Sequence, residues 1–149
     1  MANEKVIARR FEDLEVWQTA RRLARGVYKA VRTQRLGSDS PLSSQMRRAA
    51  VSIGSNIAEG FEHGTRKREI ECCYIAKGSA GELRSQIITA HDAGLVSDKA
   101  YEWLHGTCEK VSRQLHAYID HLRRTQADLP GAKFRPQRAA ARGKDKAMA

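Results

Sequence analysis

The sequence contains no long hydrophobic run and few cysteines, and both absences narrow the class of protein. No apolar stretch in the 149 residues reaches the ~18 residues that a transmembrane helix needs. The N-terminus, Met-Ala-Asn-Glu-Lys-Val-Ile, has no apolar core of a signal peptide. The three cysteines are odd in number, and Cys72 and Cys73 are adjacent, so we expect no disulfide framework. These features predict a reduced, cytoplasmic protein with no membrane partner.

Acidic residues are scarce relative to basic ones. Lys and Arg number 27 and Asp and Glu 17, which gives a formal net charge of +10. Residues 123–149 hold 8 Lys/Arg against 2 Asp/Glu and have almost no apolar periodicity. We therefore predict an N-terminal arm (residues 1–11), one folded domain (12–124) and a disordered basic tail (125–149).

Four segments have apolar residues at helical spacing, and glycines separate them. The segments are residues 12–35, 40–60, 65–93 and 97–124, with Ser40, Thr65 and Ser97 as N-caps and Gly37, Gly60 and Gly94 as stops. In the first segment the alternating steps of three and four predict a core-facing seam of Trp17, Ala20, Ala24, Val27 and Val31. Because no useful strand pattern occurs, we predict an all-α, antiparallel up-down four-helix bundle.

The run Gly78-Ser79-Ala80-Gly81 lies within the third predicted helix, where each glycine costs about 1 kcal/mol relative to alanine. Two interpretations account for it. Small residues allow two helices of one bundle to approach closely, which is the reading we favour, or they mark an interface between subunits.

No residue pattern indicates catalysis or a cofactor. A di-iron bundle site needs two Glu-x-x-His motifs, but only Glu102–His105 is present and it lies off the core seam. Cys72 and Cys108 lie on apolar stripes and are expected in the core. Ser79 is placed in mid-helix rather than at the strand-to-helix turn of a nucleophile elbow. We predict no catalytic residues, no metal and no cofactor.

One stripe of the second segment is polar. Arg48, Ser52, Asn56 and Glu59 lie on it or beside it, and Glu82 follows the glycine run in the third segment. A carboxylate pair acting on phosphodiesters is one interpretation. We favour a structural network in which Arg48 bonds to Glu59 or Glu82 and fixes the helix register, because no metal-ligand set completes the carboxylates.

The strongest functional signal is cationic. A stripe of basic residues lies away from the predicted seam of the first helix, and a second cluster starts the third helix: Arg21, Arg22, Arg25, Lys29, Arg32 and Arg35, then Arg66, Lys67 and Arg68. This distribution favours contacts with the phosphate backbone of RNA or DNA over a merely solvated surface.

Three motifs resemble those of one bacterial family. Residues 47–60 (Arg-Arg-Ala-Ala-Val-Ser-Ile-Gly-Ser-Asn-Ile-Ala-Glu-Gly) are the most specific, and residues 11–17 (Phe-Glu-Asp-Leu-Glu-Val-Trp) and 76–83 (Ala-Lys-Gly-Ser-Ala-Gly-Glu-Leu) support them. They resemble the "four helix bundle protein" family, noted in intervening sequences of 23S ribosomal RNA genes, which includes the accessory protein of diversity-generating retroelements. The similarity covers about residues 11–124.

The resemblance implies an up-down four-helix bundle that assembles into a ring, typically a homopentamer. It also implies, for the retroelement branch, nucleic-acid binding and a reverse transcriptase as partner. Our leading hypothesis is a non-catalytic nucleic-acid-binding bundle, an accessory factor for an RNA or a reverse transcriptase. The alternative is a protein–protein assembly module with no nucleic-acid role, and an enzyme that uses Glu59 and Glu82 is more distant.

Overall fold

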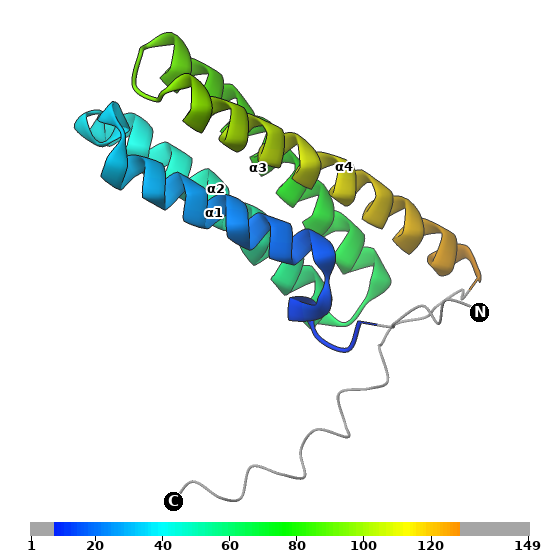
Figure 1. Cartoon of the computed structure of the whole chain (residues 1–149). Coiled ribbons are helices and arrows are strands. Elements are labelled where there is room, and N and C mark those ends of the chain that lie inside the picture. Colours follow the sequence, from blue (N-terminus) through cyan, green and yellow to red (C-terminus); the bar gives the residue numbers. More distant parts are fainter. Residues whose placement is uncertain (1–7, 129–149) are drawn as a thin grey trace, which may run out of the picture.

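The computed structural model describes residues 8–128, which form four long helices (Figure 1). α1 spans Glu15–Thr33, α2 Ser40–His63, α3 Arg66–Asp92 and α4 Asp98–Asp128. Single 3-10 turns precede and follow α1, η1 at Phe11–Asp13 and η2 at Arg35–Ser38. Successive helices run antiparallel, and the described residues contain no strand. The predicted all-α, up-down four-helix bundle is confirmed.

Each helix packs against two neighbours around the bundle. α2 packs against α1 and α3, and α4 packs against α3 and α1. α1 and α3 therefore lie diagonally opposite each other, and their outer faces point to opposite sides of the molecule (Figure 1). A feature of α1 and a feature of α3 can thus serve two separate surfaces.

Side chains cap three of the helices. The Asp39 carboxylate accepts the backbone N–H three residues on at 3.0 Å, so Asp39 is the N-cap of α2 and the predicted Ser40 is its first residue. Thr65 and Ser97 accept the corresponding N–H groups at 3.3 and 3.1 Å. These bonds confirm the predicted caps of α3 and α4.

The predicted stop of α2 at Gly60 is wrong. α2 continues to His63 and ends at Gly64, whose φ of 89° lies in the left-handed region. Gly60 is buried inside the helix, where a Cβ would lie 2.8 Å from Cys72 Cβ and 3.1 Å from Glu69 Cα. The missing side chain lets α2 and α3 touch at this point.

The outer boundaries of the bundle also differ from the prediction. α1 is shorter than residues 12–35, and α4 continues to Asp128, four residues past the predicted end at Arg124. The rest of the predicted basic tail, residues 129–149, and residues 1–7 of the predicted N-terminal arm lie outside the described residues.

The core consists of inward-facing aliphatic side chains and small residues from all four helices. Its largest fully buried members are Phe61, Leu23, Leu36, Met46, Ile53, Ile57, Leu83, Ile87, Leu104, Leu115, Leu122 and Val27. Cys72 and Cys108 are buried as predicted, and so is Cys73.

The predicted seam of α1 is only half correct. Ala20 and Val27 are buried as expected, whereas Trp17, Ala24 and Val31 are half-buried at the edge of the core. The buried apolar line is Val16, Ala20, Leu23, Val27 and Ala30. Both lines alternate steps of three and four, and the observed rotation buries Leu23 where the predicted one would bury Ala24. The larger side chain removes more apolar surface from water, so it decides the rotation.

Candidate nucleic-acid interface

The predicted cations of the first helix lie on its outer face and are exposed to solvent. All six are exposed: Arg21, Arg22, Arg25, Lys29, Arg32 and Arg35. Five of them belong to α1 itself, and Arg35 lies in η2 beyond the helix end. Since Glu15 is the one acidic residue of α1, this helix has a strongly positive outer surface.

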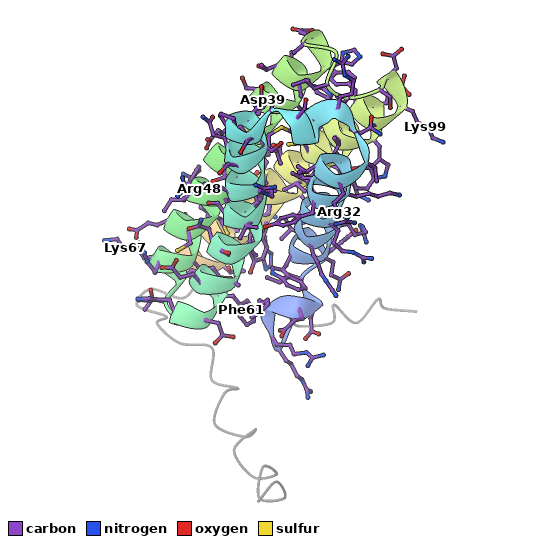
Figure 2. The ribbon with its side chains drawn as sticks, turned by 90° about the vertical axis from the view of Figure 1, so that its left-hand side faces the viewer. Arg32, Asp39, Arg48, Phe61, Lys67 and Lys99 are labelled. Carbon is purple, nitrogen blue, oxygen red and sulfur yellow. The ribbon has the colours of Figure 1, made fainter. Side chains whose placement is uncertain are left out.

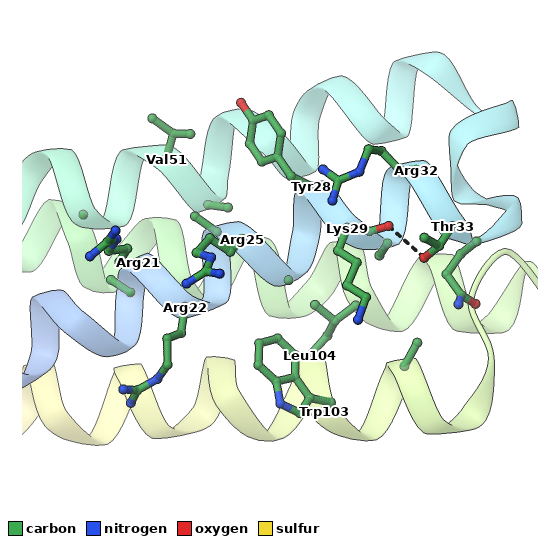
Figure 3. Close-up of a pocket in the computed structure, with 18 of the residues that line it drawn as sticks. Arg21, Arg22, Arg25, Tyr28, Lys29, Arg32, Thr33, Val51, Trp103 and Leu104 are labelled. Atoms are coloured by element: carbon green, nitrogen blue, oxygen red, sulfur yellow. Dashed lines mark hydrogen bonds between the residues drawn. The ribbon is translucent and has the colours of Figure 1, made fainter.

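An open groove with a volume of about 1170 Å³ follows both sides of α1. Residues from α1, the middle of α2 and the start of α4 line it (Figure 3). We name it the α1 groove. Its cations are Arg21, Arg22, Arg25, Lys29, Arg32 and Lys99. Among the described residues that line the α1 groove, none is Asp, Glu or His.

The positive charge of α1 is not neutralised within the part of the chain that the structure describes. None of the five α1 cations forms an ion pair there. The Arg21 guanidinium lies 5.9 Å from the centre of the Trp17 ring, and Arg22 Nη2 donates to Thr19 Oγ1 at 3.3 Å. Like charges four residues apart cost a helix about 0.2–0.5 kcal/mol per pair. This surface is therefore unfavourable for the isolated bundle and favourable for binding an anion.

Four aromatic side chains also line the α1 groove: Phe11, Trp17, Tyr28 and Trp103. Two of them, Trp103 and Tyr28, are exposed, one on each side of α1. Trp103 lies on the α4 side between Arg22 and Lys29, and Tyr28 extends toward α2 near Arg32 (Figure 3). Their exposed fractions are 48% and 43%, high values for large aromatic groups. A smaller hollow on the α2 side brings Arg47 and Arg48 close to Tyr28 as well.

The predicted second basic cluster, Arg66, Lys67 and Arg68, does not join the α1 groove. It begins α3, the helix diagonal to α1, and Figure 2 shows Lys67 on the opposite side from Arg32. Arg68 is neutralised by Glu59 at 3.1 Å and Glu71 at 3.4 Å. The hydrogen bond to Glu59 raises the pKa of Arg68 further above its usual value.

The predicted polar network exists in a different form. Ser52 Oγ shares a hydrogen bond with Ser79 Oγ at 2.9 Å, and Asn56 Nδ2 donates to Ser52 Oγ at 3.1 Å, so these residues do link α2 to α3. The prediction that Arg48 bonds to Glu59 or Glu82 is wrong.

The two glutamates of that network bind other partners. Glu59 pairs with Arg68, because the capped start of α3 brings Arg68 beside the last turns of α2. Glu82 accepts a hydrogen bond from Gln86 Nε2 at 3.2 Å, one turn along the same helix. Both glutamates are exposed. They belong to separate surface pairs.

The remaining chemical candidates are engaged in local contacts. His105 Nδ1 lies 2.8 Å from Glu109 Oε1, on the next turn of α4, and Glu102 is exposed. Cys108 Sγ donates to the Ala80 carbonyl at 3.1 Å, and burial raises the pKa of this thiol to about 11. Burial also raises the pKa of the Cys72 thiol.

A second exposed surface lies on the outer face of α3. We name it the α3 outer surface and define it by Tyr74, Ile75, Gly78, Gly81 and Ile88. A Cβ built on Gly78 or Gly81 would have no atom within 4 Å. Close packing inside the bundle, the interpretation we favoured for the run of residues 78–81, therefore accounts for Ser79, which bonds to Ser52, and for the buried Ala80, but for neither of these two glycines.

Sequence reasoning missed Trp103, Tyr28 and Lys99 as members of the α1 groove. Trp103 carried one usable signal, because a tryptophan off the apolar seam of a helix must be exposed or contact another element. Tyr28 carried the same signal on the first helix, and Lys99 carried none.

In the part of the chain that the structure describes, no helix has a stretch apolar and long enough to cross a lipid bilayer. The fold and the α1 groove together define a class: an all-α, antiparallel four-helix bundle with an acid-free cationic surface along its first helix. Residues 12–117 match the family model of the 23S rRNA-intervening sequence protein. The chain belongs to this family.

A solved structure has the same fold. It is the crystal structure of a protein with unknown function from the S23 ribosomal protein family of Bacteroides thetaiotaomicron VPI-5482. The two chains are 20% identical, and the alignment covers 70% of this chain and 95% of that one with a TM-score of 0.64. No curated protein matches the sequence.

Proposed function

We propose that the protein is a non-catalytic, nucleic-acid-binding bundle that acts as a homo-oligomer in the cytoplasm. The α1 groove is the observation that carries this proposal. It has six cations and, among its described lining residues, no acid, and the α1 cations make no ion pair in the described part of the chain. The phosphate backbone of RNA or DNA is the abundant polyanion that such a surface fits.

Binding of this kind follows from charge more than from sequence. Each phosphate that the groove neutralises releases condensed counterions, so affinity falls as salt rises, with a slope of about 0.7 to 0.9 per phosphate in log–log form. In line with the family resemblance, we propose that the bundle serves an RNA or a reverse transcriptase as an accessory factor.

A salt titration of affinity by fluorescence anisotropy, with a labelled RNA and the matching DNA, tests the proposal. The variant Arg25→Glu/Arg32→Glu reverses two groove cations. The matched control Lys67→Glu/Arg124→Glu reverses two exposed cations outside the groove, with the same change in net charge. We expect the groove variant to lose at least tenfold more affinity and to flatten the salt slope by about 2.

Equal losses in the two variants would mean that the net charge of the protein, and not the α1 groove, attracts nucleic acid. No binding of RNA or DNA by the parent at low salt would refute the proposal and leave the alternative, a protein–protein assembly module. Circular dichroism and light scattering on both variants check that helicity and oligomer size are unchanged.

The α3 outer surface supports the homo-oligomeric part of the proposal. It exposes three large apolar side chains, Tyr74, Ile75 and Ile88, around the two glycines that have open space beside them. A second copy packed there would bury the apolar groups and use the flat glycine surface for close approach. Because α1 is diagonal to α3, such an assembly leaves the α1 groove accessible.

The family resemblance suggests five subunits. Light scattering on a sizing column at low micromolar concentration tests this number. We expect a mass of several times 16.7 kDa, and a monomer at that concentration would refute the assembly.

A further inference from the structure

We propose that the α1 groove selects single-stranded over duplex nucleic acid by stacking unpaired bases on Trp103 and Tyr28. This inference rests on the proposed function and makes it specific. The cations alone would serve any polyanion. The selectivity for single strands follows from the two half-exposed aromatic rings that lie among these cations.

Trp103 packs directly against the backbone of α1 at a glycine. Its ring lies against Gly26 of α1, where a Cβ would be 2.1 Å from Trp103 Cζ3 and 2.7 Å from Cη2. Only a glycine at this position allows the ring to lie on the helix backbone. One part of the ring is thereby fixed, and 48% of the residue still faces solvent. A ring immobilised in this way loses little conformational entropy when a base stacks on it.

The cations nearest to Trp103 lie on both sides of its ring, where they can contact the phosphates of a bound single strand. Arg22 and Lys29 precede and follow Gly26 by about one helical turn each, or roughly 5 Å along the axis on either side. In Figure 3 their side chains extend on the two sides of Trp103, both toward α4. Lys99 lies one turn before Trp103 on α4 and lines the same groove. A base on Trp103 would therefore have cations within reach of the phosphates on both of its sides.

The second aromatic repeats the arrangement on the other side of α1. Tyr28 is 43% exposed, and Arg25 and Arg32 of α1 flank it in sequence. Arg47 and Arg48 of α2 line the adjoining hollow. The α1 groove thus has one exposed ring and several cations on each side of the helix. Base–aromatic stacking combined with a cationic track is the general solution for binding single strands without sequence preference.

Duplex nucleic acid cannot use these rings in the same way. In a duplex the faces of the bases are already stacked on one another, so only backbone and groove edges are available to Trp103 and Tyr28. The aromatic contribution is then lost while the phosphate contribution remains. An acidic peptide would likewise satisfy the cations and leave the rings unused.

The chain has two tryptophans, which makes the test direct. In the variant Trp17→Phe, Trp103 is the single tryptophan and reports on its own surroundings. The probes are a 12-nucleotide oligo(U), its duplex with oligo(A), and poly-glutamate, each titrated at low salt while anisotropy or light scattering follows binding and emission follows Trp103. We expect oligo(U) to quench the Trp103 emission by more than half and the duplex and poly-glutamate to bind with little quenching.

A second variant measures the energetic consequence. Trp103→Leu in the same Trp17→Phe background should weaken oligo(U) binding by about tenfold, the usual effect of losing one stacked base, and duplex binding by less than threefold. Binding of all probes with unchanged Trp103 emission, or equal losses for single strand and duplex, would overturn the stacking inference and leave the proposed function intact. Binding of poly-glutamate alone would overturn both, as would the absence of all binding.

Discussion

The ring of Trp103 lies on the backbone of Gly26, so closely that a Cβ on Gly26 would be 2.1 Å from Trp103 Cζ3. The contact joins α4 to α1 on the outside of the bundle, with the aromatic ring half-exposed. Another residue occupies the space of the missing side chain at Gly26, as at Gly60, whereas a Cβ on Gly78, Gly81 or Gly106 would have no atom within 4 Å.

Gly26→Ala should behave unlike an ordinary helical Gly→Ala substitution. Gly106, on the open side of α4, has no atom within 4 Å of a built Cβ, so Gly106→Ala should stabilise the bundle by about 0.5–1 kcal/mol. Gly26→Ala gains the same helix propensity but displaces Trp103, so its free energy of unfolding should be at least about 1 kcal/mol lower than that of Gly106→Ala. Urea unfolding measures both variants.

The emission spectrum checks the cause. In the Trp17→Phe background, Gly26→Ala should shift Trp103 emission to longer wavelength, because the displaced ring becomes more hydrated, and Gly106→Ala should leave it unchanged. Equal stabilisation by both substitutions, with no spectral shift, would show that Trp103 does not rest on Gly26 in solution.

The Ser52–Ser79 bond between α2 and α3 should contribute to stability in a non-additive way. Each single change to alanine leaves the other hydroxyl without its partner across the two helices and should cost about 1 kcal/mol. The double variant removes both polar groups, so it should cost clearly less than the sum of the singles. A double-mutant cycle by urea unfolding measures the coupling, and strict additivity would contradict a direct bond.

Cys108 should react slowly with alkylating reagents in the folded protein for two reasons: the thiol is buried, and its raised pKa keeps it protonated. Its pKa is raised by burial from 9.0 to about 11, so at pH 8 the thiolate fraction is about a hundredfold lower than in the unfolded chain. The labelling rate with iodoacetamide should keep rising with pH up to about 11, whereas in urea it should level off near 9. Peptide mass mapping after a short pulse identifies the labelled site.

The raised pKa of Cys108 also makes the stability of the fold depend on pH. Because the folded state holds the thiol proton more tightly than the unfolded chain does, the contribution of the protonated thiol to the free energy of unfolding is complete below pH 9 and is lost as pH rises from about 9 to 11. A labelling rate at Cys108 that is equal in native protein and in urea at pH 8 would show that this part of the core opens readily.

The helices were predictable because local signals determine them. Thr65 and Ser97 begin α3 and α4 through caps that need only the next three residues. The cations of α1 were predictable for a related reason: charged side chains remain exposed whichever apolar line faces the core.

The rotation of α1 and the identity of the groove depend on packing between distant segments. Leu23 and Ala24 lie on two overlapping seams with the same spacing, so periodicity does not choose between them; the burial of the larger Leu23 against the facing helices does. The Trp103–Gly26 contact and the Glu59–Arg68 pair join residues whose partnership no local pattern encodes. The stripe of α2 predicts a bond from Arg48 to Glu59 or Glu82, but Arg48 and Glu59 are about 16 Å apart along the helix axis, and the start of α3 brings Arg68 to 3.1 Å from Glu59.

The two exposed glycines of α3 provide the sharpest test of self-assembly. In an isolated bundle, a methyl group on Gly78 or Gly81 meets nothing within 4 Å, so Gly78→Ala/Gly81→Ala should raise the free energy of unfolding by about 1 kcal/mol per site. In an assembly that packs on the α3 outer surface, the same methyl groups intrude between subunits and weaken the contact. We therefore expect the double variant to dissociate at protein concentrations where the parent remains assembled, as measured by light scattering across a dilution series. Gly106→Ala is the matched control, because it makes the same chemical change on α4 and should leave the mass unchanged. A double variant that gains stability and keeps the mass of the parent at every dilution would mean that the α3 outer surface faces solvent in the assembly, and that another face of the bundle holds the subunits together.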